Sequence, residues 1–333
     1  MASREYSSTE TGAPQMGGNA AGSLLGVLRA VLVDGYGNKQ PLGWELMFVD
    51  AVNYIHVYRP RSGSRMFLKI NDNGTQSVSN YFYASAISYE NMFSVNNGIH
   101  PCPPEQNWLN NQCGRILKTC KNSITVQKWR IIGDESGFFL FIFPYSSKAT
   151  NYNNVGNIYY FGDYVCIGHD SVKNKYNWFM WTKVLNSYSN CPGHGSGQAS
   201  IIRNAYTQTK GSRFVYISSG FGPLERTALA GGYDETINGT GNYVSDQSNI
   251  NGLPVYSPVY IRDQGYSSYL LGAIPGLFDV VCQAAYKSNQ VYYDELDEKN
   301  KIVCIPVSPT NGNIGATHLR YGILIGEKFR YVF

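Results

Sequence analysis

The sequence is poor in charge for its length. Charged residues make up 15% of the 333 residues, well below the roughly 25% of an ordinary soluble domain. Lys and Arg together number 27 and Asp and Glu together number 23, for a formal net charge of +4, with no long basic run. So weak a bias gives no reason to expect direct nucleic-acid binding.

The sequence also lacks a segment that would place it in a membrane. Residues 1–20 have neither the basic start nor the apolar centre of a signal peptide. No stretch approaches the roughly 18 consecutive apolar residues that a membrane span needs. We therefore expect a protein made in the cytoplasm, with no membrane span.

The cysteines include no Cys-x-x-Cys pair, and their number is odd. They are Cys102, Cys113, Cys120, Cys166, Cys191, Cys282 and Cys304. In a cytoplasmic protein this pattern is typical of buried free thiols. Cys191-Pro-Gly-His194 has the spacing of half a zinc site, but no matching second half follows. We expect no metal site and no cofactor.

Aromatic and β-branched residues are abundant, including 27 Tyr. Past Pro41 they form short runs, separated by Gly, Asn and Pro about every ten residues, which is typical of an all-β sandwich or barrel. The predicted strands are Tyr54–Tyr58, Arg65–Ile70, Trp129–Ile132, Phe138–Phe143, Tyr159–Ile167, Trp178–Leu185, Arg213–Ser218, Val255–Ile261, Gln290–Tyr293, Lys301–Val307, Tyr321–Ile325 and Lys328–Phe333. We predict a mainly β protein with sandwich or barrel-like domains.

The first 34 residues predict an extended arm followed by one short helix. Residues 1–20 are rich in Ser, Thr, Gly and Ala and offer almost nothing to bury, so we expect them to be disordered alone and ordered against a neighbour. A helix then begins at Ser23, the predicted N-cap, and ends at Asp34-Gly35. The predicted helix anchor consists of Leu24, Leu28, Val31 and Leu32.

Glycine-rich segments suggest how the rest of the chain is divided. Residues Cys191–Gly197 form the best candidate linker. It separates a β-rich domain at 21–190, which includes the helix, from a second β-rich domain at 198–333. Residues Gly231–Gly252 form a polar loop of a length that usually contacts another molecule.

No catalytic pattern stands out from the residues alone. Hydrolysis of a polysaccharide needs two carboxylates across a cleft, but Asp134-Glu135, Asp234-Glu235 and Asp294-Glu295 are adjacent pairs better suited to solvated turns. No local signature joins any Cys to a His as a nucleophile and base. Trp178 and Trp181 are able to stack on sugars, yet they sit in an apolar run that favours core packing.

Several segments of the chain form a recognisable set of motifs. The first are Ser8-Thr9-Glu10-Thr11-Gly12-Ala13-Pro14, Gly22-Ser23-Leu24-Leu25, Leu32-Val33-Asp34-Gly35-Tyr36-Gly37 and Gly43-Trp44. Later blocks are Met66–Asp72, Trp129–Phe143, Tyr160-Phe161-Gly162-Asp163 and Leu271–Leu277. Together these segments, most densely those in the first 45 residues, resemble a family of tailed-phage virion proteins found in Mu-like and related phages.

The resemblance implies a structural component of the virion, associated with the tail or neck, and not an enzyme. Residues 8–14 are then the expected assembly arm, and the expected partners are other virion proteins and further copies of the chain. Two alternatives stay open: a receptor-binding tail fibre or tip protein that contacts a host-surface glycan, and a head decoration protein.

Overall fold

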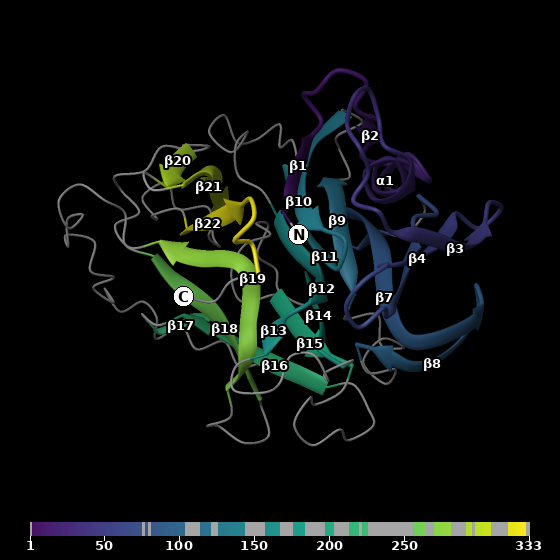
Figure 1. Cartoon of the computed structure of the whole chain (residues 1–333). Coiled ribbons are helices and arrows are strands. Elements are labelled where there is room, and N and C mark those ends of the chain that lie inside the picture. The colour runs from purple at the N-terminus through teal and green to yellow at the C-terminus, as the bar shows by residue number, and fades with distance from the viewer. Residues whose placement is uncertain are drawn as a thin grey trace.

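The computed structural model describes residues 2–74, 77–78, 81–103, 114–120, 126–143, 157–166, 176–183, 197–202, 213–219, 222–225, 256–263, 270–280, 291–294, 297–307 and 319–330. Over these residues the protein is mainly β, with antiparallel strands and one short helical segment (Figure 1). This confirms the predicted fold class.

The helical segment lies where the sequence predicts it. It begins as α1 (Ser23–Arg29) and continues as the π-helical turn η1 (Ala30–Asp34). Gly35 ends it with a φ of 81°, a conformation that costs glycine little because it lacks a Cβ atom.

The N-terminal sheet pairs β3 with β4, β4 with β5, β5 with β7, and β7 with both β8 and β9. A short strand, β6, also pairs with β7. The strands are β3 (Glu45–Asp50), β4 (Ile55–Arg59), β5 (Phe67–Asn71), β6 (Ser77–Val78), β7 (Tyr81–Ser94), β8 (Asn97–Cys102) and β9 (Arg115–Cys120).

The central sheet runs in the order β1, β10, β11, β12, β14, β15, and β2 pairs with the first two residues of β10. A single pair between β14 and β9 connects it to the N-terminal sheet. The strands are β1 (Arg4–Ser7), β2 (Met16–Gly17), β10 (Val126–Asp134), β11 (Gly137–Phe143), β12 (Asn157–Asp163), β14 (Trp178–Lys183) and β15 (Gly197–Ile201).

The C-terminal sheet runs in the order β16, β18, β19, β22, β21, β20, with β17 beside β16 and β13 beside β19. β15 pairs with β16 and so joins the central and C-terminal sheets. The strands are β13 (Val165–Cys166), β16 (Arg213–Ser219), β17 (Gly222–Glu225), β18 (Tyr256–Asp263), β19 (Leu270–Val280), β20 (Val291–Asp294), β21 (Asp297–Val307) and β22 (Leu319–Ile325).

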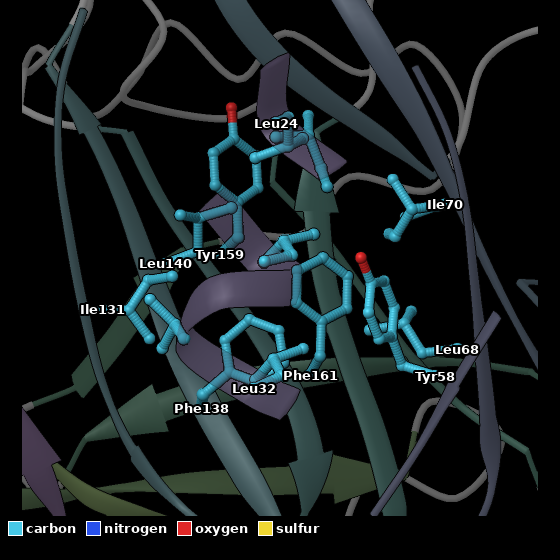
Figure 2. Close-up of a cluster of buried hydrophobic side chains, with 14 of the residues drawn as sticks. Leu24, Leu32, Tyr58, Leu68, Ile70, Ile131, Phe138, Leu140, Tyr159 and Phe161 are labelled. Carbon is cyan, nitrogen blue, oxygen red and sulfur yellow. The ribbon is translucent and has the colours of Figure 1, made fainter. Parts of the chain in front are cut away.

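Both faces of the central sheet are buried. On one face Phe138 and Leu140 of β11 pack with the helix and the N-terminal sheet (Figure 2). On the other face Phe139 and Phe141 pack with the C-terminal sheet. Alternate residues of a strand point to opposite faces, so the unbroken apolar run of β11 is what a strand buried on both sides requires.

The structure bears on the predicted linker and on the last predicted strand. Most of the predicted linker, residues 191–196, lies outside the described residues, but β14 and β15 on its two sides pair from Phe179↔Ile201 to Lys183↔Gly197. The predicted strand at Lys328–Phe333 is wrong for residues 328–330, which form a turn; residues 331–333 lie outside the described part.

Candidate assembly site

The N-terminal arm lies along one edge of the central sheet (Figure 1). β1 pairs with β10 from Arg4↔Gly133 to Ser7↔Arg130, and β2 pairs with the start of the same strand. The N–H of Ser8 donates to the carbonyl oxygen of Trp129 at 3.0 Å and extends the pairing by one residue. An uncovered strand edge would offer unpaired backbone groups to other chains, so the arm closes that edge of β10.

The arm also contributes to the core. Tyr6 and Met16 are completely buried and belong to the cluster around the helix. The prediction that residues 1–20 have no core to join is therefore wrong. Composition hid these contacts, because two apolar side chains among many small polar ones are enough to hold a strand that is already paired along its backbone.

Two hydrogen bonds from Trp129 hold the loop between β1 and β2. The indole Nε1 of Trp129 donates to the carbonyl oxygen of Pro14 at 2.9 Å, and its backbone N–H donates to the Ser8 hydroxyl oxygen at 3.2 Å. Thr9, Thr11 and Gly12 are exposed on the outer side of this loop. Of the predicted arm residues, Ser8 and Pro14 therefore contact the chain itself, whereas Thr9, Thr11 and Gly12 form a small, uncharged outer face.

Glu10 connects the arm to the loop after the helix. Its carboxylate accepts the Tyr36 hydroxyl at 2.6 Å and forms an ion pair with Lys39 at 2.9 Å. Burial alone would raise the pKa of Glu10, but the hydrogen bonds from Lys39, Tyr36 and the Ser7 N–H lower it below its ordinary value. Burial and the bond to Glu10 raise the pKa of Tyr36. The carboxylate is therefore charged at neutral pH and holds the two segments together.

Gly37 allows the two segments to approach this closely. Its φ is 53°, and a Cβ atom there would lie 2.7 Å from the carbonyl oxygen of Thr11. Any side chain at this position would push the arm away from the loop that carries Tyr36.

The predicted helix anchor packs inside the chain. Leu24, Leu28, Val31 and Leu32 are all at most 1% exposed and belong to the same cluster as Tyr6. They hold the helix in the protein's own core, between the N-terminal and central sheets, as Figure 2 shows for Leu24 and Leu32. None of the four presents a surface to a partner.

The predicted N-cap is wrong, because the helix start is held by a residue distant in sequence. The Ser23 hydroxyl donates backward to the carbonyl oxygens of Gly17 and Ala20. The N–H of Leu24 instead donates to the carboxylate of Asp72 at 2.9 Å. A capping contact across 48 positions has no local signal in the sequence.

A buried ionic joint connects the C-terminal end to the central sheet. Arg330 donates to both carboxylate oxygens of Asp134, from Nε at 2.5 Å and from Nη2 at 2.7 Å. Asp134 is 3% exposed, which corrects the prediction of a solvated turn at Asp134-Glu135. It does cap that turn, since it accepts the N–H groups of Ser136 and Gly137.

Asp163 is the second acid of this joint, and sequence alone gave no sign of its role. Its carboxylate accepts both the N–H and the hydroxyl of Ser64, and its carbonyl oxygen accepts the Tyr160 hydroxyl at 2.6 Å and Arg330 at 3.2 Å. Burial raises the pKa of Asp163 to about 6, against the lowering effects of Ser64 and Arg330. The donors that surround both carboxylates are suited to joining segments of the chain.

The other candidate residues have a mixed outcome. Trp178 and Trp181 are buried, which confirms the core-packing interpretation and removes them as sugar-stacking platforms. Of the cysteines expected to be buried, Cys102 is buried and Cys166 is only partly buried. Cys191, His194, Asp234-Glu235 and the loop at 231–252 lie outside the described residues. Within the described part of the chain, no three His, Cys, Asp or Glu side chains are grouped as a metal site requires.

Among the helical residues that the structure describes, none belongs to a helix long and apolar enough to cross a bilayer.

Comparisons with known proteins add no assignment. No protein-family model matches the chain, and no curated protein matches its sequence.

Proposed function

We propose that the chain is a structural component of a tailed-phage virion, associated with the tail or neck, and that it acts by protein–protein assembly without catalysis. The observation that supports this most is the contact between the two segments with the densest resemblance to phage virion proteins. Glu10 in the first segment binds Tyr36 in the second at 2.6 Å. The shared residues then have one physical purpose, which is to build and hold the arm.

The outer face of the arm is the proposed contact with neighbouring subunits. Thr9, Thr11 and Gly12 are exposed and uncharged, so a partner can cover them without removing a charge from water. The arm is already ordered by its own chain, which reduces the entropy that assembly has to overcome.

Incorporation into particles tests this proposal. We expect the chain in purified virions at a fixed copy number, and we expect Thr9→Arg/Thr11→Arg to lose incorporation while its melting temperature stays nearly unchanged. Asn97→Arg, at an exposed position on the β7–β8 hairpin, is the matched control and should be incorporated normally.

Two results would contradict the proposal. Absence of the chain from purified particles would exclude a structural role in the virion. Normal incorporation of the arm variant would exclude the arm as the contact. Saturable adhesion of the purified chain to host cells would favour the receptor-binding alternative.

A further inference from the structure

Lys118 and Asp72 form a close pair in the interior of the protein. The Lys118 Nζ lies 2.6 Å from Asp72 Oδ1, and the two side chains are 1% and 0% exposed. Lys118 lies on β9 and Asp72 directly follows β5, and the Nζ also donates to the carbonyl oxygen of Ala20 at 2.7 Å. The amine is thus held against the carboxyl group by two contacts, with no access to bulk water.

Burial favours the uncharged forms of both groups. It raises the pKa of Asp72, which the charge of Lys118 and the backbone N–H groups of Leu24 and Leu25 only partly offset. It lowers the pKa of Lys118, again against the attraction of Asp72. Transfer of one proton from the ammonium to the carboxylate gives a free amine and a carboxylic acid, and it removes two charges from a medium that solvates them poorly.

The Asp72 carboxyl group is oriented by a different contact at each of its two oxygens. Oδ1 faces the amine, whereas Oδ2 accepts the N–H of Leu24 at 2.9 Å. The backbone of Asp72 is fixed as well, since its N–H donates to the carbonyl oxygen of Tyr54 and its carbonyl oxygen accepts the N–H of Gly22. A donor on Oδ2 stabilises negative charge on that oxygen during attack at Cγ, and a nucleophile held in place has a high effective concentration.

We propose that Lys118 and Asp72 condense into an intramolecular amide cross-link. A bond forms between Nζ and Cγ, and the bond between Cγ and Oδ1 breaks. Oδ1 leaves as water with the acid proton and one hydrogen from the amine, to which it is already hydrogen-bonded. Oδ2 becomes the amide oxygen and keeps the N–H of Leu24. The reaction needs no other reactant, and the product joins the end of β5 to β9 beside the start of the helix.

The mass of the intact chain tests the cross-link directly. Measured under denaturing conditions, and allowing for removal of the initiator Met, the mass should be about 18 Da below that of the sequence, the mass of one water. Proteolysis should yield one branched peptide that contains both Asp72 and Lys118. A full sequence mass with separate Asp72 and Lys118 peptides would overturn the proposal.

Matched variants distinguish the cross-link from dehydration of Asp72 alone. Lys118→Arg keeps the positive charge but removes the amine, so it should have the full sequence mass; an 18 Da loss in this variant would point to a cyclic imide and overturn the proposal. Asp72→Asn should release ammonia in place of water and lose about 17 Da, again with a branched peptide. If Lys118→Arg does not fold, the branched peptide of the unmodified sequence decides the question by itself.

Discussion

The two faces of the central sheet are buried by different kinds of structure. One face packs against a helix that lies between it and the N-terminal sheet, and the arm belongs to the same cluster. The other packs against the C-terminal sheet. β11 serves both faces with alternate residues, Phe138 and Leu140 on one side and Phe139 and Phe141 on the other. A strand in the middle of three layers therefore shows a continuous apolar run, and the run says nothing about what covers either face.

The buried carboxyl groups on the two sides of the central sheet also differ, in the direction in which their pKa values are shifted. Asp72 and Lys118, on the helix side, are shifted by burial toward their neutral forms. On the C-terminal side burial would raise the pKa of Asp134, but Arg330 and the Ser136 donors lower it. Arg330 bonds both oxygens of its partner, and such two-point pairs are stronger than single contacts. The donors around a buried carboxylate therefore decide whether its pKa lies above or below the ordinary value.

The largest expected effect comes from breaking the charged joint. Asp134→Ala leaves Arg330 and the turn N–H groups without their acceptor. Removing one partner of a buried pair costs about 3–5 kcal/mol, and we expect a loss near the lower end because the Arg330 side chain is 26% exposed to water. Urea denaturation measures the loss. The matched control is Asp34→Ala, which breaks the exposed pair between Arg29 and Asp34 and should change stability by less than about 1 kcal/mol. Equal losses in the two variants would mean that Arg330 contributes no more than a surface charge.

Truncating one leucine on each face compares their packing directly. Leu28 faces the N-terminal cluster and Leu271 faces the C-terminal one, and both are at most 1% exposed. Leu28→Ala and Leu271→Ala should each cost about 2–5 kcal/mol, since each leaves a cavity as well as losing buried surface. A full loss at Leu28 with almost none at Leu271 would show that the C-terminal sheet unfolds separately from the rest.

The pH dependence of stability should reveal Asp163. Its pKa is about 6 in the folded protein and near 3.8 when unfolded, so between these values the folded state binds more protons. Stability from this group is fully present below about pH 3.8 and is lost, by roughly 3 kcal/mol in total, as the pH rises through about 6. Asp163→Asn should remove that fall while keeping an acceptor for Ser64. The observable is the difference in unfolding free energy between the two proteins from pH 4 to 7, and a constant difference would contradict the assignment.

The smallest expected loss of stability comes from removing one hydroxyl group in the arm, that of Tyr6. The Tyr6 hydroxyl donates to the carbonyl oxygen of Gln40 at 2.6 Å, while its ring is completely buried. Tyr6→Phe keeps the ring and should cost about 1 kcal/mol for the lost hydrogen bond, measured as a shift of the denaturation midpoint. Deletion of residues 2–20 should cost far more, because it also removes Met16 and uncovers β10. A deletion as mild as Tyr6→Phe would mean that the arm is not part of the folded core.

The sequence alone is enough for the fold class and for the helix at residues 23–34. The strands Gly137–Phe143 and Trp178–Lys183 are recognisable because aromatic and β-branched runs between turn residues have few other stable uses. The helix at residues 23–34 was recognisable because its apolar side chains recur with a helical period and Gly35 ends it. These are local signals, carried by neighbouring residues.

Only the tertiary structure decided what the arm, the cap and the acids do. The sequence predicts an arm that is disordered alone and ordered against a neighbour, because backbone pairing with β10 leaves no trace in composition. The sequence predicts a solvated turn at Asp134 and gives no sign of the roles of Asp72 and Asp163, because the partners of Asp72, Asp134 and Asp163 lie 46, 196 and 99 positions away. The position of a charge along the chain does not determine its distance from a counter-ion or from water, and those distances fix its pKa and its contribution to stability.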